Sequence, residues 1–192
     1  MPETRFPELT PETMTAEQRR VAEAIQAGPR GAGLRGPFNA LLRSPELADA
    51  VQKVGAFIRF RSSIPAPLNE LAILVTGRKW MAQYEFYAHR QLGLKAGMRP
   101  EIADAIAEGK RPEAMGEDEA DVYDFATELM HYGAVSDAIY ARALARFGER
   151  GVIDLVGACG YYSLVSLVLN VAQVPLPPGE APPLRELSGG ER

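Results

Sequence analysis

Apolar side chains recur at three- and four-residue intervals along most of the chain, and this spacing predicts helices. No stretch alternates convincingly between apolar and polar residues, so no strand is expected. The sequence therefore predicts an all-α fold, a single-domain helical bundle of about seven or eight helices around one core. Glycines, prolines and capping residues place these helices near residues 15–27, 44–61, 69–79, 81–92, 100–109, 116–131, 136–147 and 149–172.

The two ends of the chain differ from this pattern. Residues 1–14 carry three prolines and predict an extended arm. Residues 174–192 carry five prolines and form a tail that either wraps a neighbouring subunit or is disordered. The domain itself is expected to span residues 15–173.

A glycine-rich segment over residues 28–37 contains a match to G-x-G-x-x-G at residues 31–36. A dinucleotide site needs a strand before this motif and a helix directly after it. Here a helix precedes the motif and Pro37 follows it. The segment is therefore interpreted as a loop that lets Phe38, Leu41 and Leu42 pack inward.

The charge and cysteine content narrow the function classes. A net charge of −4 and a pI near 5.3 argue against a nucleic-acid partner. The single cysteine, Cys159, cannot form an internal disulfide or a C-x-x-C redox pair. The first residues lack the basic start and apolar run of a signal peptide. These features predict a cytoplasmic protein.

Residues 155–172 of the last predicted helix carry no charge and are long enough to cross a bilayer. The segment is, however, interrupted by small and polar residues, and the chain has no second span. We expect no membrane partner, and interpret the segment as a core helix or a subunit contact.

The stretch over residues 70–89 concentrates candidate chemistry. Glu85 and His89 are four apart and share one helical face, where a carboxylate raises the pKa of an imidazole. The aromatic residues around this pair favour a lined pocket over an exposed ion pair. Glu70 lies 19 positions before His89, which is about 28 Å along a straight helix. Glu70 can join the site only if the chain turns back at residues 77–80.

Together with Glu70, the run Tyr-Glu-Phe-Tyr-Ala-His at residues 84–89 resembles the carboxymuconolactone decarboxylase superfamily, which includes the alkyl hydroperoxidase D-like enzymes. The superfamily resemblance extends to residues 135–140, 147–156 and 160–162. In all it covers about residues 35–176. It implies an alkyl hydroperoxidase D-like all-α fold. It also implies a homo-oligomer, a trimer or hexamer with a dimer as the alternative, whose sites lie near subunit contacts.

The peroxidase branch of this superfamily has a Glu, a C-x-x-C and then a His. Here the two cysteine positions hold Ala82 and Glu85, so the dithiol peroxidase mechanism cannot operate. The decarboxylase-like branch resembles the chain better. It implies a lyase without a cofactor that acts by acid–base catalysis on a small cyclic carboxylate or lactone. Cys159 lies in the apolar last helix and is expected to be a core residue.

In this interpretation His89 is the acid or base, Glu85 orients it or shares its proton, and Glu70 is the second carboxylate. The substrate would be bound by hydrogen-bond donors and cations near this stretch and by polar groups of the last helix. These candidates are Trp80, Tyr84, Arg78, Lys79, Arg59, Arg61, Tyr161, Tyr162 and Asn170. Alternatively, the charged candidates are ordinary solvated surface residues, and the polar candidates of the last helix are core groups whose hydrogen bonds are made within the protein.

Three other interpretations stay open. Glu70, Glu85 and His89 could together hold iron or manganese, although no second histidine lies nearby. The chain could be alkylhydroperoxidase-like without the redox cysteines, or a non-catalytic oligomeric binding protein with a degenerate site. His131, at the end of a predicted helix, is best explained by its favourable interaction with the helix dipole.

Overall fold

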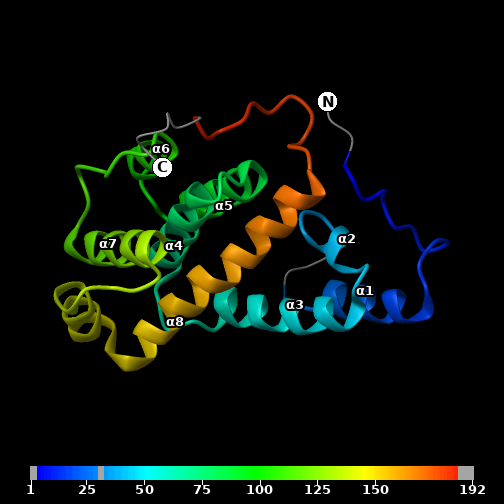
Figure 1. The fold of residues 1–192 in the computed structure, drawn as a ribbon, viewed down its shortest axis with the longest axis horizontal. Coiled ribbons are helices and arrows are strands. Elements are labelled where there is room, and N and C mark those ends of the chain that lie inside the picture. Colours follow the sequence, from blue (N-terminus) through cyan, green and yellow to red (C-terminus); the bar gives the residue numbers. More distant parts are fainter. Residues whose placement is uncertain (1–3, 30–32, 186–192) are drawn as a thin grey trace.

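A computed structural model describes residues 4–29 and 33–185, and in these residues it contains helices and no strand. The predicted all-α fold is confirmed (Figure 1). The helices are α1 (Ala16–Ala27), α2 (Phe38–Leu41), α3 (Pro45–Phe60), α4 (Ala66–Lys79), α5 (Gln83–Lys95), α6 (Pro100–Ala107), α7 (Glu117–Tyr132) and α8 (Asp137–Ala172).

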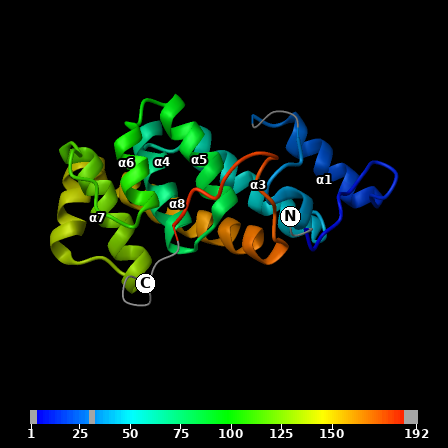
Figure 2. The ribbon, with the colours of Figure 1, turned by 90° about the horizontal axis from the view of Figure 1, so that it is seen from above.

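Helix α4 lies at the centre of the fold, because every residue from Leu68 to Arg78 is buried. It packs against α5, α6, α7 and α8. One part of the core fills the space between α4, α6, α7 and the beginning of α8. A second part joins α1, α2 and α3 to the later turns of α8. Helix α8 therefore runs between two groups of helices, as Figures 1 and 2 show.

Most helix starts follow the sequence signals, but α4 and α5 begin elsewhere than predicted, α5 at Gln83 rather than at residue 81. Thr15 and Gln18 form the expected capping box of α1, with reciprocal backbone contacts of 3.2 and 2.9 Å. Helix α4 begins at Ala66, directly after Pro65, and so starts three residues before the predicted Asn69. The Asn69 side chain instead donates to the Ile58 carbonyl at 3.2 Å. The short α2 was not predicted.

The chain reverses direction between α4 and α5, which is the condition for Glu70 to lie near Glu85 and His89. The turn is at Trp80 and Met81 rather than at residues 77–80, and Met81 adopts a positive φ of 51°. Gly77 lies inside α4 and is not the break. A Cβ on Gly77 would stand 3.7 Å from the backbone nitrogen of Phe86, so this glycine lies where α5 packs against α4.

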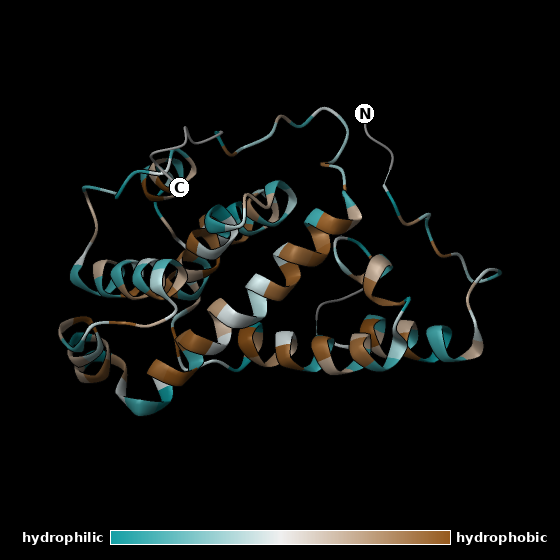
Figure 3. Ribbon diagram, viewed as in Figure 1, coloured by the Kyte–Doolittle hydropathy of each residue, from teal (hydrophilic) through white to brown (hydrophobic). Residues whose placement is uncertain are grey.

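Helix α8 contains a break at Gly148, where φ is 67° and ψ is 177°. This agrees with the two helices predicted on either side of that glycine. By length and composition α8 could cross a membrane, and 56% of its apolar window is buried in the structure. Apolar residues follow one another along most of its second half (Figure 3).

Both terminal segments lie along the chain's own helices. In the arm, the Arg5 backbone N–H donates to the Ala172 carbonyl at 2.9 Å. In the tail, Leu184 is 4% exposed and exchanges two hydrogen bonds with the Gln83 side chain. Within residues 174–185, the tail is therefore attached at Leu184 to the start of α5 of its own chain. Residues 1–3 and 186–192 of the arm and tail lie outside the described part.

Candidate functional site

His89 lies between two carboxylates that come from the paired helices α4 and α5. Its Nδ1 is 2.6 Å from Oε2 of Glu70, and its Nε2 is 3.1 Å from Oε1 of Glu85. The turn between the helices brings Glu70 to the pair that the i,i+4 spacing had predicted. The expected grouping of Glu70, Glu85 and His89 is therefore present in the structure.

Two glycines let the helices approach each other around these carboxylates. A Cβ on Gly77 of α4 would lie 3.9 Å from the Cβ of Glu85, which belongs to α5. A Cβ on Gly93 of α5 would lie 3.4 Å from the Cβ of Glu70, which belongs to α4, and 2.9 Å from Cε of Met98. Each helix thus presents a glycine beside the carboxylate of the other. The sequence analysis did not identify this role for either glycine.

The three side chains are almost completely buried, with exposed fractions of 6% for His89, 8% for Glu70 and 3% for Glu85. Burial of the ring opposes its charged form, but the charges of Glu70 and then Glu85, together with the short hydrogen bond to Glu70, raise the pKa of His89 to about 9. At neutral pH His89 is therefore an imidazolium. Both ring nitrogens then carry protons, and each lies beside a carboxylate oxygen.

Tyr162 of α8 closes one side of this site. Its ring meets the His89 ring edge-on, with centroids 4.6 Å apart and planes at 75°. Within the described part, its hydroxyl is buried without a hydrogen-bond partner, and so is Oγ of Ser166 one turn later. Burial, followed by the charges of Glu85 and Glu70, raises the pKa of Tyr162 well above its ordinary value. Its hydroxyl remains a neutral donor at physiological pH.

The contact between His89 and Glu85 is the looser of the two. Oε1 of Glu85 is 3.1 Å from Nε2, but the approach is not aligned as a hydrogen bond, and this oxygen is buried without a directed partner in the described part. The contact with Glu70 is short and is a hydrogen bond. Nε2 is therefore the ring atom that can be released most easily to another acceptor.

The other predicted substrate-binding residues make contacts elsewhere. The Trp80 indole donates to Oγ of Ser163 on α8 at 2.8 Å. Nη1 of Arg78 donates to the Arg185 carbonyl in the C-terminal segment at 2.8 Å. Tyr84 packs beside the loop at Gly36. Tyr162 is thus the one predicted substrate-binding residue whose ring contact with His89 places it at this site.

Among the candidate cations, Arg59 is the one whose charge acts on a residue of this site, Tyr162. It lies at the end of α3, and its charge acts on the Tyr162 hydroxyl in the direction of a lower pKa. Arg59 and Arg61 also lie over the rings of Phe60 and Phe57, at 5.1 and 5.4 Å. Arg59 was one of four cations that the sequence left as equal candidates.

The arrangement does not suit a metal held by all three groups. Glu70 and Glu85 occupy opposite nitrogens of the His89 ring, so the three cannot converge on one ion. Across residues 4–29 and 33–185, no group of three or more His, Cys, Asp or Glu side chains could hold a metal ion.

The remaining candidates have structural roles. Burial raises the pKa of Cys159 to about 11, so its reactive thiolate is scarce at neutral pH. This agrees with the core role predicted for Cys159. His131 is exposed in the last turn of α7, where its ring meets that of Tyr132 edge-on.

No protein-family model matches the chain, and no curated protein matches it. The likeness to the carboxymuconolactone decarboxylase superfamily therefore rests on the residues of the 70–89 stretch and the later familial segments.

Proposed function

We propose that the chain is a carboxymuconolactone decarboxylase-like lyase, which removes a carboxylate from a small cyclic acid or lactone by acid–base chemistry without a cofactor. The observation that carries this proposal is the buried imidazolium of His89 between Glu70 and Glu85. A charged histidine held in a fixed orientation away from solvent is suited to delivering a proton.

Glu70 and Glu85 have different roles in this mechanism. The short hydrogen bond from Nδ1 to Glu70 fixes the ring and stabilises its charged form, so Glu70 is a positioning residue. The looser contact at Nε2 opens when substrate binds, and Nε2 then faces the reacting carbon. Glu85, released from that contact, takes up a proton from water that enters as the product leaves, and passes it to His89, so that the imidazolium is restored.

In the chemical step, the bond between the ring carbon and the carboxylate breaks and CO₂ leaves. The electron pair moves into the neighbouring lactone carbonyl and forms an enolate. The Tyr162 hydroxyl donates a hydrogen bond to the enolate oxygen, since it has no protein partner in the described residues. His89 Nε2–H then protonates the carbon, and Arg59 binds a second carboxylate of the substrate where one is present.

We further propose that the chain forms a homo-oligomer in the cytoplasm through the outward face of α8. Large apolar side chains recur along this face and are between 36% and 67% exposed: Ile153, Val156, Leu164, Leu167 and Val171. The opposite face of α8 is packed in the core. A second copy, rather than lipid or nucleic acid, is proposed to cover the stripe. Light scattering of wild type and Leu167→Glu tests this, and equal masses would contradict it.

The enzyme proposal is tested by measuring CO₂ release from a panel of lactone carboxylates and β-keto acids. His89→Gln is expected to lower kcat by about 10²- to 10⁴-fold. His131→Gln is the matched control, because it removes the chain's other histidine from an exposed position. If no substrate is turned over, or His89→Gln and His131→Gln both equal the wild type, the non-catalytic oligomeric binding protein becomes the better explanation.

The alkylhydroperoxidase-like alternative requires a reactive thiol, and Cys159 is the only candidate. Peroxide reduction that is lost in Cys159→Ser would favour that alternative, against the high pKa of this buried group.

A further inference from the structure

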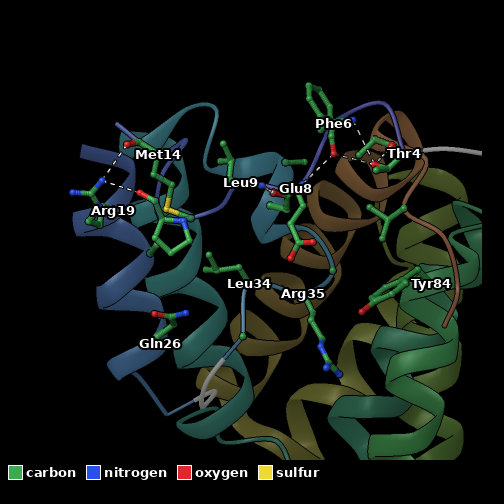
Figure 4. Close-up of a pocket in the computed structure, with 18 of the residues that line it drawn as sticks. Thr4, Phe6, Glu8, Leu9, Met14, Arg19, Gln26, Leu34, Arg35 and Tyr84 are labelled. Atoms are coloured by element: carbon green, nitrogen blue, oxygen red, sulfur yellow. Dashed lines mark hydrogen bonds between the residues drawn. The ribbon is translucent and has the colours of Figure 1, made fainter. Parts of the chain in front are cut away.

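A cavity lies away from His89, beneath the N-terminal arm. It has a volume of about 680 Å³ and is bounded by the arm, α1, the loop at residues 33–36, the side of Tyr84 and the segment after α8 (Figure 4). Cavities of roughly 300–1,000 Å³ are typical of small-molecule sites.

The arm that covers this cavity is held by specific hydrogen bonds. The Leu9 backbone N–H donates to Oδ1 of Asn39 at 2.9 Å, and Nδ2 of Asn39 donates to the Phe6 carbonyl at 3.1 Å. Arg19 of α1 donates to the Pro11 carbonyl at 2.8 Å. These contacts hold the arm against Asn39 and α1, so the arm forms a defined wall of the cavity.

The loop at residues 33–36 builds the opposite wall, and its two glycines have positive φ, 133° at Gly33 and 67° at Gly36. A Cβ on Gly36 would be 3.1 Å from Cε1 of Tyr84, so glycine is needed for this ring to approach the loop. This loop is the second half of the G-x-G-x-x-G match, whose first two residues lie outside the described part. The match thus corresponds to a wall of a cavity and not to a dinucleotide fold.

One region of the cavity presents a cation and a hydroxyl. Figure 4 shows the Arg35 side chain running from the loop with its guanidinium on the side of the Tyr84 hydroxyl, and the positive charge of Arg35 acts on that hydroxyl. Arg35 is exposed and forms no ion pair with any residue that the structure describes. Elsewhere the cavity is lined by a mixture of polar side chains and apolar ones, and the apolar ones include Leu9, Met14 and Leu34.

We propose that this cavity binds a small amphipathic monocarboxylic acid, with its carboxylate on Arg35 and Tyr84 and its hydrocarbon body against Leu9, Met14 and Leu34. A guanidinium beside a hydroxyl is well suited to a carboxylate. Glu8 and Glu23 also line the cavity and repel a second negative charge, so dicarboxylates are excluded. This site does not depend on the proposed lyase activity, because neither His89 nor its two carboxylates line it.

Three ligands of equal chain length test the proposal by calorimetry: octanoate, 1-octanol and octanedioate. The wild type is expected to bind octanoate at least about tenfold more tightly than the other two, because hydrogen bonds to a charged group discriminate by this amount or more. Arg35→Gln should reduce octanoate binding to the level of octanol. Tyr84→Phe keeps the ring beside Gly36 and should weaken octanoate binding severalfold.

Arg20→Gln is the matched control, since Arg20 is an exposed arginine of α1 that does not line the cavity. Backbone NMR shifts induced by octanoate should fall at residues 33–36 and around Tyr84. The proposal is wrong if octanoate does not bind saturably, or if Arg35→Gln binds it as the wild type does. Shifts confined to the exposed face of α8 would also refute it, because that face offers a non-specific apolar alternative.

Discussion

The proton that His89 holds between Glu70 and Glu85 links the stability of the fold to pH. Histidine titrates near 6.5 in an unfolded chain, whereas the two carboxylates raise the pKa of His89 to about 9. The folded state therefore binds this proton more tightly. The stabilisation is fully present below about pH 6.5 and is lost as the pH rises through about 9, which corresponds to about 3 kcal/mol of unfolding free energy.

Urea unfolding between pH 6.5 and 8.5 isolates this effect, and the single tryptophan, Trp80, provides the fluorescence signal. Over this window the wild type should lose about 2 kcal/mol of unfolding free energy. The range ends at pH 8.5 because Cys159, whose pKa burial raises from 9.0 to about 11, destabilises the folded state at higher pH. His89→Gln is less stable at pH 6.5 but should show little change with pH.

His131→Gln is the control and should keep the pH dependence of the wild type, because its side chain is exposed. The reasoning is refuted if His89→Gln loses as much stability between pH 6.5 and 8.5 as the wild type. It is also refuted if NMR shows a neutral His89 ring at pH 7.5, since both ring nitrogens should then carry protons.

Three further predictions concern single residues. Gly36→Ala should cost more unfolding free energy than Gly133→Ala: both have positive φ, which costs about 1–2 kcal/mol, but the Cβ meets a ring only at Gly36. Urea unfolding compares them. Leu184→Ala should cost about 2 kcal/mol or more in the same assay, whereas exposed Leu47→Ala should stay within about 0.5 kcal/mol. Cys159 should react with a thiol reagent at pH 8 only when the chain is unfolded, and fast labelling of the folded protein would contradict its burial.

The helices could be predicted largely because their caps and periodicities are local. Thr15 with Gln18, and Pro45 after Ser44, marked starts that the structure contains. The start of α4 could not be placed from the sequence in this way. Asn69 has the side chain of a helix cap, but the helix begins three residues earlier, directly after Pro65, and Nδ2 of Asn69 donates to the Ile58 carbonyl of α3.

The site was predictable in part for the same reason. The spacing of Glu85 and His89 is local, whereas the contribution of Glu70 required the chain to reverse. The closeness of α4 to α5 at Gly77 and Gly93 is a property of two packed helices, and no local pattern indicates it. The direction of the Tyr84 side chain, however, could have been predicted from the sequence. Consecutive helical residues point about 100° apart, so Tyr84 and Glu85 could not face the same site.

The cost of burying Glu70, Glu85 and His89 favours a function over a structural role. Moving a charged group from water into the protein interior costs several kcal/mol of free energy for each ion. Ion pairing in the interior recovers only part of that cost. Three apolar side chains of similar volume would hold α4 against α5 without this penalty. They would not need the unpartnered hydroxyl of Tyr162 beside them. A chain that keeps a charged array where apolar packing would be less costly, with a neutral donor next to it, retains groups that fit the transfer of a proton better than they fit packing.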